Sequence, residues 1–424
     1  MSDPRAQSAQ VLPTDAADPT LVGRIWVPGA GPRLVAVAGD ALVDVTALGP
    51  TMTELVQESD PASRVRAILA GDATAAAATD AAAGTTAAAA TETLSAPTRW
   101  DLDEVLAATV READRRRGAE GPVELAETVL LSPVDLQVLK AAGVTFVRSM
   151  IERVIEERVG GDPTKAAAVR DQLKETLGES IRDIRPGSPE ALAALEVLRE
   201  NGLWSQYLQV GLGTHPEVFT KAPILSSVGH GSDVGIAGIS TWNNPEPELV
   251  LVIDGAGQVK GATLGNDANL RDMEGASALL LPLAKDNNAS AALGPFIRLF
   301  DDAFTLEDAA ATTITMRITG EDGFELEATA PQSDISRPVS ELAAHTINRR
   351  HQYPDGLVLY CGTPFAPTED RGEPGQGFTH HEGDLVSISS PQLGTLTNRV
   401  TPSESAPVWD YGVLDLVRDL HRAG

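Results

Sequence analysis

The sequence predicts an α+β fold that is mainly β, in which a small β-containing N-terminal domain precedes a larger, strand-rich domain. The length of 424 residues exceeds that of one ordinary domain. Many short apolar runs beyond Trp204 are separated by Gly, Pro, Asp and Asn, which is typical of strands. Helical periodicity is concentrated between Phe146 and Asn201. We expect the two domains to span residues 21–130 and 131–404.

Before and within the first domain, composition changes along the chain. Residues 1–20 are polar and are expected to form a disordered tail. The runs 33–38 and 41–46 flank Gly39-Asp40, which predicts a β-hairpin with a tight turn. Residues 70–93 are almost wholly Ala, Thr, Asp and Gly, so we expect a surface insertion without an anchor in the core.

The second domain is expected to begin with helices and continue as strands. Apolar residues recur at helical spacing from Phe146 to Ile155, and Gly160-Gly161 ends that helix. Asp162-Pro163 and Ser188-Pro189 each place a capping side chain before a proline, which predicts two more helix starts. The remaining apolar runs predict strands at residues 249–253, 313–319, 324–330, 357–361, 385–389 and 395–400, and we interpret residues 405–424 as a C-terminal tail.

Charge and cysteine content restrict the partners. The formal charge of −27 argues against nucleic acid and against an anionic membrane surface. An acidic small molecule could still bind, provided that a metal ion or a local group of cations attracts it. Cys361 is the single cysteine, which excludes an internal disulfide and fits a reducing compartment. Without a leader-like start or a long apolar stretch, the chain is expected to be cytoplasmic.

Two glutamates precede the apolar run 249–253. In an extended chain Glu246 and Glu248 point the same way, about 7 Å apart along the backbone. An isolated pair of this kind is usually a solvated edge. Residues 261–272 follow an Asp254-Gly255 turn, however, and can return antiparallel so that Asp267 lies beside both glutamates. Three carboxylates predict a site for Mg²⁺, or for Mn²⁺ or Ca²⁺, with coordination positions left for water and substrate.

Several ordered motifs resemble the catalytic domain of the fumarylacetoacetate hydrolase superfamily over roughly residues 140–400. They are Glu246-x-Glu248, Gly265-Asn266-Asp267-x-x-x-Arg271-Asp272, Lys285 ahead of Leu293-Gly294-Pro295, Tyr360-Cys361-Gly362-Thr363-Pro364, Gly383-Asp384 and Leu393-Gly394-Thr395-Leu396-Thr397-Asn398-Arg399-Val400. The resemblance implies a β-roll catalytic domain, a homodimer or higher homo-oligomer, and a 2-oxo acid substrate. It also implies metal ligation by the three carboxylates, substrate contact by Lys285, and a substrate-binding loop at Gly362 and Thr363.

One departure from the hydrolase pattern concerns the base that activates water. Hydrolase members carry a His and a Glu in an Asn-Tyr-x-x-His-x-x-Glu pattern, whereas this sequence keeps Glu152 but has Ser149 in the place of the His. A serine without a neighbouring base cannot deprotonate water usefully near pH 7. Hydrolysis of a carbon–carbon bond by the usual pair is therefore in doubt.

Residues 143–149 and 217–221 are more similar to the sugar-acid dehydratase branch. That resemblance implies conversion of 2-dehydro-3-deoxy-D-arabinonate or its D-xylonate equivalent to 2,5-dioxopentanoate through a metal-stabilised enolate. It assigns proton transfer to Glu217 and Lys285 in an order that the sequence leaves open. Arg148, Ser149 and Glu152 would bind or orient the polyol end of the substrate.

Two alternatives remain open at this point. An acylpyruvate or diketo-acid hydrolase of the same superfamily would share the metal and the enolate but would cleave a carbon–carbon bond. A non-enzymatic protein that holds a structural cation would bind metal without turnover and would have no need of Lys285.

Overall fold

The computed structural model describes residues 3–15, 18–71, 97–160, 162–166, 168–169, 184–200, 202, 204–371 and 377–423. The Ala/Thr-rich segment expected as an insertion lies outside these residues, apart from its first two. Most of the helix expected after Asp162-Pro163 also lies outside them, and only the short 3₁₀ turn Pro163–Lys165 is described.

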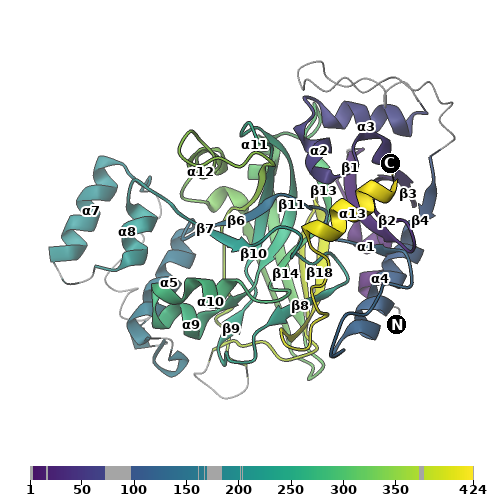
Figure 1. Cartoon of the computed structure of the whole chain (residues 1–424). Coiled ribbons are helices and arrows are strands. Elements are labelled where there is room, and N and C mark those ends of the chain that lie inside the picture. Colours follow the sequence, from purple (N-terminus) through teal and green to yellow (C-terminus); the bar gives the residue numbers. More distant parts are fainter. Residues whose placement is uncertain are drawn as a thin grey trace.

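An 11-stranded mixed sheet forms the centre of the molecule (Figure 1). Its order is β4-β3-β2-β1-β13-β11-β10-β16-β6-β7, and β5 pairs with β1. The bounds are β1 Leu21–Val27, β2 Gly31–Ala38, β3 Ala41–Asp44, β4 Arg99–Asp101, β5 Val129–Leu130, β6 Val138–Gly143, β7 Glu217–Ala222, β10 Pro247–Ile253, β11 Val259–Asp267, β13 Ala291–Leu299 and β16 Leu357–Tyr360.

The N-terminal strands extend this sheet. The predicted hairpin is confirmed as β2 and β3, with Gly39 at φ +64° in the turn. Strand β1 pairs antiparallel with both β2 and β13. Backbone hydrogen bonds thus connect the N-terminal part, through β13, to the neighbouring strands that carry the carboxylates of the predicted metal site. The expected N-terminal β-containing part is confirmed. Strands from before and after the boundary expected near residue 130 belong to one continuous sheet.

A second, five-stranded sheet packs against the first. Its order is β15-β14-β17-β18-β8. The bounds are β8 Asp233–Ile236, β14 Thr313–Thr319, β15 Glu325–Pro331, β17 Leu385–Ser390 and β18 Gly394–Pro402, and a separate pair consists of β9 Asn243–Asn244 and β12 Asn269–Leu270. All the strands predicted beyond Trp204 are present, each within two residues of its expected bounds. The expectation of a mainly β, α+β fold is therefore confirmed.

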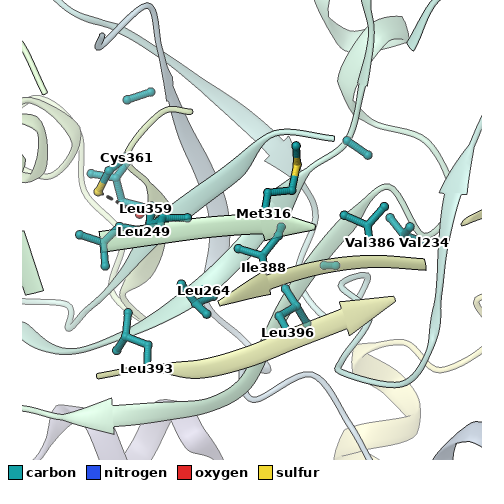
Figure 2. Packing of buried hydrophobic residues seen from close by; sticks show 14 of the residues in the cluster. Val234, Leu249, Leu264, Met316, Leu359, Cys361, Val386, Ile388, Leu393 and Leu396 are labelled. Carbon is teal, nitrogen blue, oxygen red and sulfur yellow. Dashed lines mark hydrogen bonds between the residues drawn. The ribbon is translucent and has the colours of Figure 1, made fainter. Parts of the chain in front are cut away.

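The core between the two sheets explains why β10 is a continuous apolar run. Leu249 and Leu251 face the second sheet, where they belong to one cluster with Met316 and Ile388 (Figure 2). The alternate side chains of β10 join the cluster on the opposite face of the sheet. A strand buried on both faces needs apolar residues at every position. Cys361 lies in the first cluster, fully buried.

Helices cover the margins of the sheets. α5 Val147–Val159 ends at Gly160 in the left-handed conformation, as predicted, and α7 Pro189–Glu200 begins after Ser188, whose hydroxyl accepts the Ala191 N–H at 3.1 Å. α5, α9 and α10 lie together beside the sheet (Figure 1). The other bounds are α1 Ser8–Val11, α2 Met52–Gln57, α3 Pro61–Leu69, α4 Leu102–Arg116, α8 Gln206–Leu212, α9 Arg271–Ala276, α10 Leu281–Lys285, α11 Leu306–Ala310, α12 Val339–Thr346 and α13 Val413–Ala423.

The described part of the N-terminal segment is packed, contrary to the expectation of a disordered tail. Val11 is fully buried and Arg5 nearly so. Asp15 forms an ion pair with Arg298 of β13 at 2.7 Å. A single apolar anchor and two charged groups with partners hold the segment, and sequence composition does not reveal such partners.

The C-terminal segment, expected as a tail, contains helix α13. Tyr411 packs edge-on against Trp26 of β1, with ring centroids 5.5 Å apart, and donates a hydrogen bond to Asp419 at 2.9 Å. Residues of α13 and of β1 line a cavity of about 780 Å³, and none of the predicted site residues lines it. No helix in the described ranges is long and apolar enough to cross a lipid bilayer.

Candidate active site

The three predicted metal ligands converge. One carboxylate oxygen from each of Glu246, Glu248 and Asp267 lies within 4.8 Å of the others, and all three residues are buried. Glu246 directly precedes β10, Glu248 lies within it, and Asp267 ends β11. The antiparallel pairing expected from the sequence produces this arrangement: Glu248 is opposite Gly265, and the Asp267 N–H donates to the Glu246 carbonyl at 3.0 Å.

Two buried lysines neutralise part of this negative charge. Lys285, at the end of α10, has its Nζ 2.6 Å from Glu246 Oε2 and 3.0 Å from Asp267 Oδ2. Burial opposes the charged form, but the carboxylates of Asp267 and Glu246 dominate and raise the pKa of Lys285 above its ordinary value. Lys221 of β7 has its Nζ 2.9 Å from Asp267 Oδ1 and donates to the Ala268 carbonyl at 3.0 Å. Lys285 therefore carries a proton beside the cluster.

Glu248 is held by backbone. The Gly362 N–H donates to Glu248 Oε2 at 2.6 Å, and Gly362 adopts φ +94°. A Cβ at this position would lie 1.9 Å from Thr145 Oγ1, which itself donates to the Cys361 carbonyl at 2.8 Å. The glycine of the predicted loop is thus required by both its conformation and its close contact.

The donor set fits a hard divalent cation. Glu248 has no ion pair with a lysine or arginine among the described residues, and burial together with Asp267 and Glu246 raises its pKa well above the ordinary value. Asp267 Oδ1 is buried and accepts no hydrogen bond of good geometry. Oxygen ligands from three carboxylates are what Mg²⁺ and Mn²⁺ prefer, and a dication would supply the missing positive charge.

Glu217 begins β7 and faces the same cluster. It pairs with Gly143 across the sheet, and a Cβ at Gly143 would lie 2.3 Å from Glu217 Oε2. The side chain is half-buried. Burial, with the charges of Glu246 and Asp267, raises the pKa of Glu217 above its ordinary value against the effect of the nearby cations. The role of Glu217 in proton transfer stays a prediction.

The predicted substrate contacts on α5 are only partly brought to the cluster. Glu152 is buried, with Oε2 3.4 Å from Arg271 NH2. Ser149 is buried and donates to the Phe146 carbonyl at 2.9 Å. Arg148 is exposed. In the loop after β16, the Thr363 hydroxyl donates to the Phe365 carbonyl at 2.6 Å. The roles of Arg148, Ser149 and Thr363 in substrate binding stay predictions.

Sequence reasoning assigned no role to three cations of the site, namely Arg153, Lys221 and Arg271. Arg153 of α5 pairs with Glu246, and Arg271 of α9 pairs with Glu156 at 2.7 Å and stacks over the Trp242 ring at 4.6 Å. Lys221 lies on β7 four positions after Glu217, at an irregularity in the pairing of β7 with β6, so strand alternation alone does not place it in the site. Nothing in the local sequence places Arg153 beside a residue 93 positions away.

The chain matches known proteins over most of its larger domain. The family model "Fumarylacetoacetate (FAA) hydrolase C-terminal" matches residues 193–401. The 2-dehydro-3-deoxy-D-arabinonate dehydratase of Saccharolobus solfataricus is 32% identical over 277 residues, which cover 58% of this chain and 88% of that protein. The probable 2-keto-3-deoxyxylonate dehydratase of Haloferax volcanii is 32% identical over 202 residues, covering 48% of this chain and 66% of that protein.

Solved structures share the fold. The apo form of a 2-keto-3-deoxy-D-arabinonate dehydratase aligns with a TM-score of 0.54 and 19% identity, covering 90% of this chain and 99% of that one. A 2-keto-3-deoxy-D-arabinonate dehydratase complexed with magnesium and 2,5-dioxopentanoate aligns with a TM-score of 0.53 and 18% identity, with the same coverage. At this level of identity these structures support the architecture alone.

Proposed function

From the premise that this chain belongs to the fumarylacetoacetate hydrolase family, we propose that it dehydrates 2-keto-3-deoxy sugar acids. The expected substrates are 2-dehydro-3-deoxy-D-arabinonate and its D-xylonate equivalent, and the expected product is 2,5-dioxopentanoate. The relatives named as dehydratases support the substrate class, and one neighbouring structure contains magnesium and that product.

The observation that carries the proposal is the composition of the buried cluster. Three carboxylates that fit a divalent cation lie beside Lys285 and Glu217. The position that would hold the water-activating base of a hydrolase is Ser149, whose hydroxyl is bonded to backbone. Among the described residues no histidine is paired with any of these groups. The cluster therefore has groups for proton transfer to and from a substrate, but Ser149 stands where the hydrolase pattern has its histidine.

The residues divide the work by charge. Glu246, Glu248 and Asp267 would hold a divalent cation, which when bound supplies Lewis-acid polarisation of the substrate's 2-oxo group. Glu217 is the proton acceptor for C3, because Lys285 is already protonated and cannot accept. Lys285 is the proton donor to the hydroxyl that leaves C4. The C4 hydroxyl leaves as water with the proton of Lys285, a C3–C4 double bond forms, and return of the C3 proton from Glu217 to Lys285 restores both residues. A proton shift from C5 to C3 then gives an enol, whose tautomerisation yields the C5 aldehyde of 2,5-dioxopentanoate.

The position of the site also favours an anionic substrate. The chain as a whole has a charge of −27, which repels a carboxylate in solution. Within the cluster, however, Lys221, Lys285 and Arg153 all lie within ion-pair distance of the metal-ligand carboxylates. With a dication added, the local charge is balanced well enough for a 2-oxo acid to bind.

The proposal is tested by product analysis on the whole chain. The Mg²⁺-loaded protein is incubated with 2-keto-3-deoxy-D-arabinonate, with its D-xylonate equivalent and, separately, with acylpyruvates, and products are identified by mass. Loss of one water from a sugar acid, abolished by chelation and by Glu246→Gln, is the expected result. Glu325→Gln is the matched control, because Glu325 is exposed on β15 and should leave turnover unchanged.

Each alternative predicts a different outcome. Release of pyruvate from acylpyruvates without dehydration would show that the protein is a hydrolase despite Ser149. Metal binding without turnover of any of these compounds would favour a structural-cation protein. Lys285→Met separates the dehydratase from the structural-cation protein, since it should abolish dehydration, whereas a merely structural cation would still bind.

A further inference from the structure

A ladder of buried ion pairs connects the metal ligands to helix α5. Arg153 contacts Glu246 Oε1 through NH2, while its NH1 lies 2.5 Å from Glu156 and 2.6 Å from Glu274 Oε2. Arg271 then pairs with the other oxygen of Glu156 at 2.7 Å. These side chains come from α5, α9 and the start of β10, and all of them are buried.

Both oxygens of Glu246 are thus in contact with cations of the chain. Oε1 contacts Arg153, and Oε2 bonds to Lys285 at 2.6 Å. A divalent cation that binds the same carboxylate must approach one of these oxygens to about 2.0–2.6 Å. The metal and the side-chain cation would then contact the same carboxylate, and two positive charges this close together in a buried site repel strongly. Because a carboxylate has only about four acceptor positions, this repulsion is relieved when one of the two resident cations weakens its contact with Glu246 as metal binds.

Arg153 is better placed than Lys285 to do so. Lys285 bridges two metal ligands, Glu246 and Asp267, and moving it would break two buried ion pairs at once. Arg153 already has two further carboxylates beside NH1, and Glu274 Oε2 accepts no hydrogen bond of good geometry despite its 2.6 Å ion pair. A guanidinium has five N–H donors, so it can lose one partner and improve its bonds to the others.

We propose that Arg153 is the resident counter-cation of Glu246 and that a bound divalent cation displaces it onto Glu274 and Glu156. Arg153 is in this sense a positioning residue: it balances the charge of the Glu246 carboxylate in competition with the metal, and it transmits metal binding to α5. Because Glu156 lies on α5 and Glu274 on α9, the displaced guanidinium links the two helices more tightly. Helix α5 also carries Arg148, Ser149 and Glu152, so metal binding would order the wall that the proposed substrate meets.

The test measures Mg²⁺ and Mn²⁺ affinity by calorimetry on the full chain, without substrate. Arg153→Gln should lower the dissociation constant by at least about tenfold, because it removes a positive charge that opposes the metal. Glu274→Gln should raise it by about tenfold, because Arg153 then has a poorer alternative partner. In the double variant the Glu274→Gln effect should shrink to within about threefold, since Glu274 acts through Arg153.

Three controls keep the outcome interpretable. Arg337→Gln removes a buried arginine that pairs with Glu341 away from the cluster, and it should leave metal affinity unchanged. Thermal melts verify that each variant is folded, and Glu156→Gln replaces Glu274→Gln if the latter is not. Hydrogen exchange of the α5 amides should slow on Mg²⁺ addition in the wild type and not in Arg153→Gln.

The results distinguish a failure of this inference from a failure of the proposed function, on which the metal centre of the inference rests. Additive effects in the double variant, or weaker metal binding in a folded Arg153→Gln, would overturn the counter-cation role. Wild-type protein that binds neither Mg²⁺ nor Mn²⁺ would overturn both the inference and the dehydratase proposal. Metal binding with the expected affinity changes but without sugar-acid turnover would leave the inference intact and refute the dehydratase.

Discussion

We expect the folding stability to depend on pH through His230, because its hydrogen bonds require a neutral ring with the proton on one particular nitrogen. The Thr397 N–H donates to His230 Nδ1 at 3.1 Å, so Nδ1 must be unprotonated. Nε2 lies 2.9 Å from the Arg5 carbonyl and must be the donor. The ring is therefore neutral and buried between the N-terminal segment and β18, and protonation would place a second N–H against the Thr397 donor.

The magnitude follows from the difference between folded and unfolded pKa. Burial, together with the charge of Arg5, lowers the pKa of His230 from 6.5 to about 4. The unfolded chain binds the proton below pH 6.5, whereas the folded chain does not until about pH 4. Stability from this group is thus complete above pH 6.5 and is lost as pH falls, by about 1.4 kcal/mol per pH unit and about 3 kcal/mol in all.

The assay compares the free energy of unfolding of wild type and His230→Asn in urea, at steps between pH 7.5 and pH 4. Asn cannot titrate, although its amide oxygen can still accept from Thr397 N–H. The variant should be less stable at pH 7.5, but the gap should narrow by about 3 kcal/mol on acidification. His421→Asn, at an exposed position on α13, is the control and should follow the wild type. Parallel curves for wild type and His230→Asn would refute the reasoning.

Three further predictions concern the site. Mg²⁺ at 100 times its dissociation constant should stabilise the wild type by about 2.7 kcal/mol in a thermal or urea unfolding experiment. It should not stabilise Glu248→Gln, which lacks one of the ligand carboxylates. Equal stabilisation of both proteins would exclude Glu248 as a ligand. Lys221→Met removes one of the two buried cations that pair with Asp267 and leaves Lys285 as the other, so it should cost about 1–3 kcal/mol of unfolding free energy, against less than about 0.5 kcal/mol for Lys165→Met at an exposed position. Gly362→Ala should lower the unfolding free energy, measured in the same way, by about 2–4 kcal/mol, because the new Cβ would meet Thr145. Gly39→Ala is the control: it is also at positive φ but has nothing within 4 Å of the new Cβ, and it should cost about 1 kcal/mol. Similar losses in the two variants would mean that the conformation and not the contact requires the glycine at position 362.

The strands and the carboxylates were predictable because the information for them is local. The apolar run of β10, the turn at Asp254-Gly255 and the return of β11 all lie within residues 246–267, and alternation alone places Glu246 and Glu248 on one face. The motif resemblance supplied Lys285 and Glu217, which spacing could not relate to the hairpin. Strand β13 was missed because Gly294-Pro295 interrupts its apolar pattern, although the strand continues through it.

The elements that were wrong or missing depend on tertiary contacts. The N-terminal segment looks disordered by composition, yet Val11 and the ion pair of Asp15 hold its described part against the sheets. The C-terminal residues form α13 and pack through Tyr411 on Trp26, a contact that joins the two ends of the chain. The N-terminal segment has too few apolar residues to indicate its own fold. The C-terminal segment, by contrast, has Val413, Leu416, Val417 and Leu420 at helical spacing, a signal that its interpretation as a tail overlooked.

The same distinction explains why the cations of the site were harder to identify than its acids. The three carboxylates lie on one hairpin, whereas Lys221, Lys285 and Arg153 come from β7, α10 and α5 and meet only in the folded chain. A chain with 60 acidic and 33 basic residues can bind an acidic substrate only where basic residues are concentrated. Burying these cations against carboxylates concentrates them without exposing them to other anions. Under the proposed role of Arg153, a divalent cation competes with these groups for the same oxygens, and metal affinity then depends on the arginine and lysines as well as on the ligands themselves.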